Sequence, residues 1–361
     1  MTDLLLNWYK HHRRDLPWRE NIQPYRIWVS EIMAQQTRIA QLLPFYERFI
    51  ARFPDVKALA EASEDEVLKE WAGMGYYARA RNLHTAAKIL LREQAGALPE
   101  TAEEWRRLPG VGEYTAGAIM SIAYGAREAA VDGNALRVYA RLADDATDIS
   151  APAAKKSAAA FIKAAMPTEP KRVSQFTQAL MELGALICVP GREPRCGECP
   201  LERVCLSRRA GREKLLPVKS SKRPPKETDI TVLLIQNPTG RVLTRRRTEN
   251  LLRGMWVFYL IEKSLTEEEI SGYVRSMGYT IQAWEAIGSA SHVFTHRIWR
   301  MKGYAVYVHE THTVEDYAFT SKEALGQLAL PKAMRFYSDW LLSLRTLCPP
   351  PVPGVEYNHF F

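Results

Sequence analysis

The chain has 361 residues, of which 47% are hydrophobic and 25% charged, and its formal net charge is +8. This length exceeds that of a typical single domain, so about two or three domains are expected. No segment approaches the roughly 18 consecutive apolar residues of a membrane span, and charges directly follow the short apolar N-terminal piece. The sequence therefore predicts neither a transmembrane helix nor a secretory signal. The positive charge favours a polyanionic partner.

Residues 1 to about 205 are predicted to be mostly helical, because they are rich in Ala, poor in β-branched runs and contain N-cap signals such as Ser63-Glu64-Asp65-Glu66. Within them Glu31 stands in an apolar helical run, with Trp28 three residues before it. A carboxyl group buried there would have a raised pKa and keep its proton near neutral pH, as a general acid requires. By composition alone, a solvated Glu31 beside Gln35 on a polar helix face explains the pattern equally well.

A tight turn at residues 108–112, LPGVG, separates two predicted helices, the first of which begins with a capping box of Thr101 and Glu104. Gly110 and Gly112 allow close approach of another surface, with N–H groups pointing outward at a helix start, which suits a phosphate. Farther on, Asp132 stands where another helix is expected to begin. The alternative is a glycine-rich connection followed by an ordinary Asp cap.

Four of the five cysteines form the pattern C-x7-C-x2-C-x5-C, namely Cys188, Cys196, Cys199 and Cys205. In a chain of this size without a secretory signal, metal ligands are expected rather than disulfides. The spacing fits a [4Fe–4S] cluster and a structural zinc equally well. The loop also carries Arg192 and Arg195, with Arg203 nearby, which suit either phosphate contact or plain solvation. Cys348 stands apart and is expected to be a free thiol.

Residues 206–226 hold eight Lys or Arg and one Glu and are interpreted as a linker. Strand signals begin at residue 229, and a hairpin is predicted from strands 231–235 and 241–244 around an Asn-Pro-Thr-Gly turn. The sequence predicts further strands near 256–261, 281–287 and 298–308 and helices near 267–277 and 332–347. This pattern indicates an α+β domain, followed by an irregular tail.

Several motifs occur in the order that resembles the MutY family of adenine DNA glycosylases over most of residues 8–205. They are LPWR at 16–19, WVSEIMAQQTR at 28–38, GMGYYARARNL at 73–83, and LPGVG followed by Asp132. The resemblance implies an all-helical helix-hairpin-helix glycosylase domain, 1–206, in two lobes. A six-helix barrel lobe with the hairpin would span 20–128, and a lobe of 1–19 with 129–206 would hold a [4Fe–4S] cluster on the four cysteines. The family's first cysteine loop is one residue shorter.

The resemblance also implies the chemistry of N-glycosidic bond hydrolysis. Glu31 would protonate the departing adenine, and an ionised Asp132 would stabilise the oxocarbenium-like sugar. Tyr114 occupies the position where strand-cutting relatives carry a Lys, and no Lys lies between Lys88 and Lys155. The enzyme is therefore expected to be monofunctional and to leave an abasic site.

Further residues take their roles from the same resemblance. Asn134 would join the catalytic group. DNA or base contacts would come from Arg19, Gln36 as a polar plug, Thr37, Tyr76 as an aromatic wedge, Gly110, Gly112, and Gln178 at the adenine edge.

Beyond a basic linker at 207–228, residues 229–348 resemble the family's C-terminal MutT-like (Nudix-fold) module, which recognises 8-oxoguanine, and 349–361 would form the tail. The helix region 266–275 lacks the REXXEE pattern of Nudix hydrolases, so recognition without hydrolysis is expected. The family's Phe-Ser-His loop corresponds to Phe294-Thr295-His296, in which Thr keeps the hydroxyl and adds a methyl group. His292 and His296 are also compatible with ordinary hydrogen bonding.

The expected partner is double-stranded DNA containing A:8-oxoguanine or A:G mismatches, acted on by a monomer in a bacterial-type cytoplasm, without a membrane. Two alternatives remain. A relative of this fold could act on another base, such as thymine in T·G, although the extra β-rich domain argues against that. A non-catalytic DNA-binding protein would need neither Glu31 nor Asp132.

Overall fold

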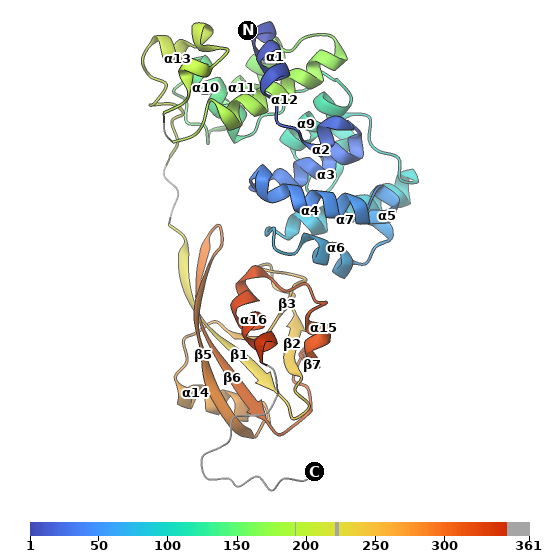
Figure 1. Cartoon of the computed structure of the whole chain (residues 1–361), viewed down its shortest axis with the longest axis vertical. Coiled ribbons are helices and arrows are strands. Elements are labelled where there is room, and N and C mark those ends of the chain that lie inside the picture. Colours follow the sequence, from blue (N-terminus) through green and yellow to red (C-terminus); the bar gives the residue numbers. More distant parts are fainter. Residues whose placement is uncertain (192, 221–223, 345–361) are drawn as a thin grey trace. The chain divides into compact units, whose positions relative to one another are not determined.

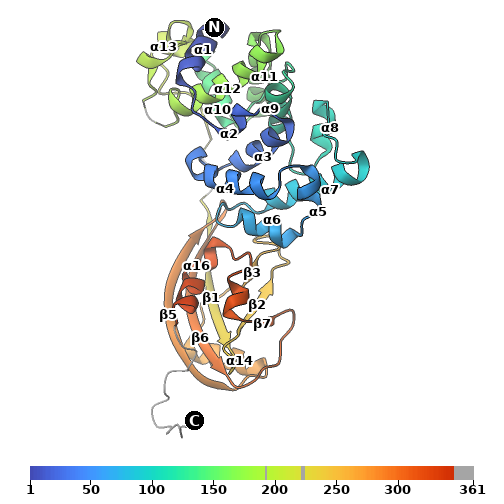
Figure 2. The same ribbon diagram turned by 45° about the vertical axis from the view of Figure 1, so that its right-hand side comes forward.

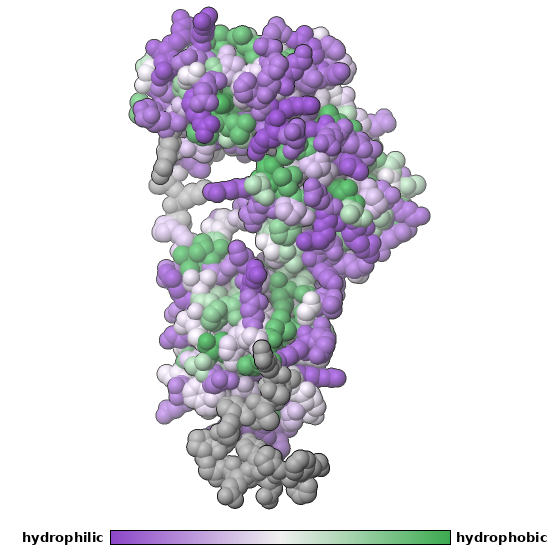
Figure 3. Space-filling view, in the orientation of Figure 1, coloured by the Kyte–Doolittle hydropathy of each residue, from purple (hydrophilic) through white to green (hydrophobic). Residues whose placement is uncertain are grey.

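The computed structural model describes residues 1–191, 193–220 and 224–344. Some sequence predictions fall outside these ranges, namely those for Arg192, the linker residues 221–223, Cys348 and the tail at 349–361. The chain forms two compact units (Figure 1): Met1–Ala62 with Arg79 onward to the linker, and Ser63–Ala78 with the C-terminal part. Hydrophilic residues cover much of the visible surface of each unit (Figure 3). Within the described ranges, every helix is too short or too polar to cross a membrane.

The first unit is helical, as predicted. Four of its helices, α2, α3, α11 and α12, begin with Pro, which has no N–H to lose at a helix start. The helices before the hairpin are α1 (Thr2–His12), α2 (Pro17–Glu20), α3 (Pro24–Ala34), α4 (Ile39–Arg52), α5 (Val56–Glu61), α7 (Ala78–Gln94) and α8 (Ala102–Arg107). Those after it are α9 (Glu113–Ala123), α10 (Gly133–Leu142), α11 (Pro152–Ala165), α12 (Pro170–Leu186), the 3-10 turns η1 (Cys196–Glu198) and η2 (Glu202–Val204), and α13 (Leu206–Arg209).

The predicted caps are present. Thr101 and Glu104 form a reciprocal capping box at the start of α8, and Ser63 and Glu66 form another at α6 (Glu64–Trp71), which belongs to the second unit. Because local side chains satisfy the first N–H groups of these helices, their starting points are readable from short sequence spacings.

One apolar core joins the N-terminal helix to the later part of the helical unit. Leu5 and Trp8 of α1 pack with Val138 of α10 and with Phe176 and Leu183 of α12. This packing brings α1 against α12, more than 150 residues away in sequence, and so places both ends of the unit around one pocket described below.

Residues 206–220 differ from the expected linker, because they pack on the helical unit. Arg141 donates Nε–H to the carbonyl of Leu216 at 2.9 Å, and the N–H of Ile149 donates to Val218 at 3.0 Å. Arg208 pairs with Glu202 and Glu213 at 3.1 and 2.9 Å. The basic residues that indicated a solvated connection are thus partly engaged in ion pairs that fix this segment.

The C-terminal part is an α+β domain, as predicted. Its sheet has the strand order β3-β2-β1-β6-β5, with β4 and β7 pairing β1 and β2. The strands are β1 (Lys226–Gln236), β2 (Val242–Arg246), β3 (Trp256–Val257), β4 (Tyr259–Ile261), β5 (Ile281–Val293), β6 (Arg297–Val308) and β7 (Ala318–Thr320). The helices are α14 (Glu267–Ser276), α15 (Lys322–Leu325), the 3-10 turn η3 (Lys332–Met334) and α16 (Arg335–Ser343). Figure 2 shows β5 and β6 as a long, curved antiparallel pair.

Central strand β1 is buried on both faces. Val232 and Leu234 face the core that contains α16, whereas Leu233 and Ile235 face the core that contains α14. The sheet is thus covered by a helix on each side. The predicted β1–β2 hairpin is present, with Gln236 opposite Val242.

Other predicted boundaries differ. The strand expected at 256–261 divides at Phe258 into β3 and β4, and the single helix expected from 332 becomes η3 and α16. The short elements β7 and α15 were not predicted, because three or four residues carry little periodic signal.

Candidate active site

Glu31 lies on the buried side of α3, with 7% of its surface exposed, which decides between the buried and solvated alternatives left open by the sequence. The hydroxyl of Tyr114, on α9, donates a hydrogen bond to its Oε2 at 2.6 Å. Burial raises the pKa of Glu31 to about 7; the charge of Asp132 adds to the rise, while the Tyr114 bond and Arg19 oppose it. This carboxyl group is therefore partly protonated at neutral pH, which a general acid requires.

Asp132 caps α10 and has a different set of partners. Its Oδ1 accepts the N–H of Ala135 at 2.7 Å, and its Oδ2 accepts the side-chain amide of Asn134 at 2.9 Å. Burial raises the pKa of Asp132 as well, which its polar sequence context does not indicate, and those N–H donors oppose the rise. Because N–H donors favour the ionised form, Asp132 is better suited than Glu31 to carry negative charge.

Gly117 sets the spacing between α9 and the segment that leads to Asp132. A Cβ atom at this position would lie 2.5 Å from the carbonyl oxygen of Ala129. Only glycine allows the backbone at 129 to approach the helix that carries Tyr114 so closely. The segment that leads to Asp132 therefore packs against α9, the helix whose Tyr114 contacts Glu31.

The predicted hairpin turn is present between α8 and α9. Gly110 has a φ of +81°, and a Cβ atom on it would lie 2.9 Å from Cβ of Asn82, so this position requires glycine. Gly112 is the N-cap residue of α9, and nothing lies within 4 Å of the place its Cβ would occupy. The first N–H groups of α9 thus start beside open space, an arrangement suited to a phosphate.

A basic cavity adjoins this turn. Gly112 and Tyr114 line it from α9, and Val131 lines it from the segment before Asp132. Four cationic side chains surround it, namely Arg106 of α8 and Lys155, Lys156 and Lys163 of α11, against the carboxylates of Glu113 and Glu128. Lys163 pairs with Glu128 at 3.5 Å. The balance of charge at this cavity is positive.

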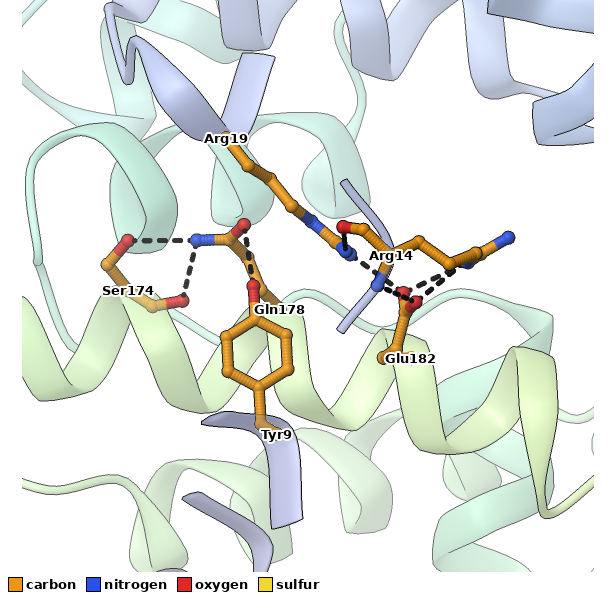
Figure 4. Close-up of polar contacts among 6 residues, drawn as sticks. All are labelled: Tyr9, Arg14, Arg19, Ser174, Gln178 and Glu182. Atoms are coloured by element: carbon orange, nitrogen blue, oxygen red, sulfur yellow. Dashed lines mark hydrogen bonds and ion pairs between the residues drawn. The ribbon is translucent and has the colours of Figure 1, made fainter. Parts of the chain in front are cut away.

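A second cavity lies at the far end of α9, between α1 and α12. Its lining includes Tyr9, Arg19, Ile122, Ser174 and Gln178. Figure 4 shows Gln178 between two partners: Tyr9 donates its hydroxyl to Oε1 at 3.2 Å, and Nε2 donates to the carbonyl and hydroxyl of Ser174, each at 3.3 Å. Gln178 therefore presents a fixed amide in the wall of a cavity.

Arg19, another predicted contact residue, is held beside this cavity by Glu182. Its Nη2 donates to Oε2 of Glu182 at 2.7 Å, its Nη1 donates to the carbonyl of Arg14 at 2.8 Å, and it lies over the ring of Tyr9 (Figure 4). Arg14 contributes three more N–H donors to Glu182. Although burial opposes ionisation of Glu182, these donors lower its pKa to about 2. The Arg19 Nε is buried and has no hydrogen-bond partner among the described residues.

Gln36 and Thr37 follow α3 directly. Gln36 has a φ of 58°, a left-handed conformation that is rare for a residue with a side chain and often marks a functional position. Arg79 of α7 supports the segment: it donates to the carbonyls of Ile32, Met33 and Gln35 and, from Nη2, to Oγ1 of Thr37 at 3.2 Å. Sequence reasoning missed Arg79 because nothing in its local motif shows that it reaches the end of another helix.

Tyr76 belongs to the second unit and shares the backbone feature of Gln36. Its φ is 51°, two left-handed glycines, Gly73 and Gly75, precede it, and 46% of its surface is exposed. An exposed aromatic ring on a strained turn is energetically unfavourable in the protein alone, which is consistent with a residue that contacts a binding partner.

The four cysteines line one cavity, in which Val138, Leu142 and Leu183 supply apolar walls. Arg141 donates Nη1–H to Sγ of Cys188 at 3.3 Å, and the Sγ of Cys205 donates to the carbonyl of Arg141 at 3.3 Å. The donor set fits a [4Fe–4S] cluster, whose irons each take one thiolate. Within the described ranges no three His, Cys, Asp or Glu side chains gather on a single ion position. Arg195 and Arg203 are exposed near this cavity.

The predicted lesion-binding loop, Phe294-Thr295-His296, joins β5 to β6. The N–H of Phe294 bonds the carbonyl of Arg297 at 2.7 Å, and its ring packs edge-on against Trp299. The carbonyl of His296 accepts the N–H of Lys226 at 3.1 Å.

On α14, Glu269 caps the helix with Thr266 and pairs with Lys263 at 2.6 Å. Glu269 is thereby engaged in local contacts with Thr266 and Lys263.

Comparison with known proteins identifies the two kinds of domain in this chain. The model of the HhH-GPD superfamily base excision DNA repair proteins matches residues 29–164, and the NUDIX domain model matches 231–339. The chain is 33% identical over 356 residues to the adenine DNA glycosylase of Homo sapiens, covering 81% of this chain and 64% of the human protein. It is 30% identical over 298 residues to that of Buchnera aphidicola subsp. Acyrthosiphon pisum, covering 82% and 83%.

Against the human relative the chain spans slightly less than two thirds of the length. Among solved structures, a thermostable thymine-DNA glycosylase superposes with a TM-score of 0.51 at 26% identity, covering 58% of this chain and 95% of that one.

Proposed function

The chain belongs to the family of adenine DNA glycosylases, and we propose that it hydrolyses the N-glycosidic bond of adenine mispaired with 8-oxoguanine or guanine in duplex DNA. The observation that carries this proposal is the buried Glu31, with its pKa near 7, bonded to Tyr114 and influenced electrostatically by Asp132. Glycosidic bond cleavage needs an acid for the leaving group and a negative charge for the sugar cation.

In this mechanism Glu31 transfers its proton to the adenine ring as the bond to the sugar breaks. Asp132, held by the Ala135 N–H and the Asn134 amide, stabilises the positive charge on the sugar until water adds. Tyr114 takes the place of an amine beside these groups. A phenol has no nitrogen with which to form a Schiff base, so the product is an abasic site with the strand intact.

Two cavities in the helical unit provide places for the two ends of the flipped nucleotide. Adenine offers an N6 donor, and Oε1 of Gln178 keeps a lone pair that can accept it. The unpartnered Arg19 Nε is a further donor beside the same cavity, within the part of the chain that the structure describes. Phosphates of the same strand would meet the α9 N-terminus and the lysines of α11.

Residues Phe294, Thr295 and His296 would recognise the 8-oxoguanine opposite the adenine. Cys188, Cys196, Cys199 and Cys205 would hold a [4Fe–4S] cluster, which would cross-link the segment from α12 to α13 when bound. The four thiols around one cavity, with Arg141 bonded to one sulfur, support that assignment.

The test is single-turnover base release from duplexes with adenine opposite 8-oxoguanine, G, T or C, and with thymine opposite G. Strand breaks are measured before and after hot alkali. We expect adenine release to be fastest opposite 8-oxoguanine, with breaks only after alkali. Thymine release without adenine release would reject the adenine assignment, and breaks before alkali would reject the monofunctional mechanism.

A further inference from the structure

Tyr9 has no role in the proposed chemistry, yet it donates a hydrogen bond from α1 to Gln178. Tyr9 is 3% exposed and Gln178 is 5% exposed, so neither group exchanges this contact for bulk water. Burial raises the pKa of Tyr9, which keeps its phenol protonated and able to donate. The oxygen end of the Gln178 amide therefore has a permanent donor.

The nitrogen end of the amide is fixed from its own helix. Nε2 of Gln178 donates to the carbonyl and hydroxyl oxygens of Ser174 at 3.3 Å. If the amide were reversed, its oxygen would face the Ser174 carbonyl oxygen, and its NH2 group would face the hydrogen of the Tyr9 hydroxyl. The two partners together select one of the two orientations of the amide (Figure 4).

Glu182 supports Tyr9 through Arg19. Its carboxylate is fully buried and binds Arg19, whose guanidinium lies 5.6 Å from the centre of the Tyr9 ring. A buried carboxylate with four N–H donors is costly to disturb, so Arg19 and the ring beneath it stay in place. The contacts form a continuous path from Glu182 through Arg19 and Tyr9 to Gln178.

We infer that Tyr9 is a positioning residue for base selection, because it fixes the orientation in which Gln178 meets the base. This inference rests on the proposed function. With the amide fixed, one lone pair of Oε1 remains for the base, and it suits the N6 amino group of adenine. Hypoxanthine carries an oxygen in place of the N6 amino group, so it meets the amide oxygen with a second acceptor.

The test compares single-turnover release of adenine and hypoxanthine, each opposite 8-oxoguanine, by wild type, Tyr9→Phe and Glu182→Gln. Tyr9→Phe keeps the ring beneath Arg19 and removes only the hydroxyl. We expect the adenine-to-hypoxanthine rate ratio to fall roughly tenfold, on the scale of one base-edge contact. Glu182→Gln should lower the same ratio, and Glu182→Asp should restore part of it.

Tyr25→Phe is the matched control, since the Tyr25 hydroxyl is also buried and donates to a backbone carbonyl, that of Phe53 at 2.8 Å. It should leave the ratio unchanged. If Tyr9→Phe slows release of both bases by one common factor, or changes neither, Tyr9 has no part in selection. If wild type releases no adenine, the proposed function fails, which is a separate outcome.

Discussion

The phenolic oxygen of Tyr114 lies 2.6 Å from Oε2 of Glu31, which joins helix α9 to α3 at the centre of the site. This bond stabilises the ionised carboxylate and so holds the pKa of Glu31 lower than burial alone would set it. In Tyr114→Phe the pKa should rise above about 7, and the alkaline limb of the rate profile should move to higher pH. The measurement is single-turnover adenine release from pH 5 to 9; an alkaline limb at lower pH would contradict it.

Glu31→Gln should abolish base release and stabilise the protein at alkaline pH. The folded-state pKa of about 7 exceeds the ordinary 4.5, so folded wild type binds a proton that the unfolded chain has lost. Its stability therefore falls as pH rises from about 4.5 to 7, by up to roughly 3 kcal/mol. Urea unfolding should show the variant to be more stable at pH 8 and equal near pH 4.5. Equal stability at both pH values would mean that Glu31 is not desolvated.

Asp132 both caps α10 and carries charge, and two substitutions separate these roles. Asn caps helices as well as Asp, whereas Ala does not. Asp132→Asn should lose base release while keeping the free energy of unfolding within about 1 kcal/mol. Asp132→Ala should lose base release and the helix cap, and its free energy of unfolding should fall by about 0.5–2 kcal/mol. Substantial activity in Asp132→Asn would show that the charge is dispensable.

Lys155 and Lys156 should contribute to DNA affinity without affecting sequence or mismatch preference. Each phosphate contact releases about 0.9 counterions, so the double Ala variant should lower the slope of log Kd against log salt by about 1.8. Fluorescence anisotropy with matched and mismatched duplexes measures this, with exposed Lys88 of α7 as the substitution control. An unchanged slope would place the α11 lysines away from the phosphates.

The identity of the group held by the cysteines can be decided by elemental analysis. Protein purified without oxygen should contain about four iron and four acid-labile sulfide per chain, as a [4Fe–4S] cluster requires. Cys199→Ser should lose most of both. One zinc per chain, with no sulfide, would support a structural zinc site instead.

Features set by short sequence spacings were predictable. The capping boxes at Thr101 and Ser63, the glycines of the hairpin and the cap at Asp132 each depend on residues within four positions of one another. In all of these, local backbone geometry determines the outcome. The burial of Glu31 was not decided by its neighbours, which fit a solvated carboxylate equally well; the three-dimensional packing of α3 decides it.

Features that depend on distant partners were not predictable. Tyr9 and Gln178 are 169 residues apart, and Arg14 and Glu182 are 168 apart, so no periodicity relates them. Charge gave a wrong indication at Arg208, because a cation in a basic segment can be paired rather than solvated. The parallel pairing of β1 with β6 likewise joins strands that no turn signal connects.

Gly117 constrains how this sequence can diverge. Since any side chain there collides with the carbonyl of Ala129, a substitution at 117 is tolerated only if the backbone before Asp132 moves as well. Such a movement would displace the carboxylate from its place beside α9. A substitution at position 117 is therefore expected to require a compensating change in the segment that precedes Asp132, so the two positions should change together as the sequence diverges.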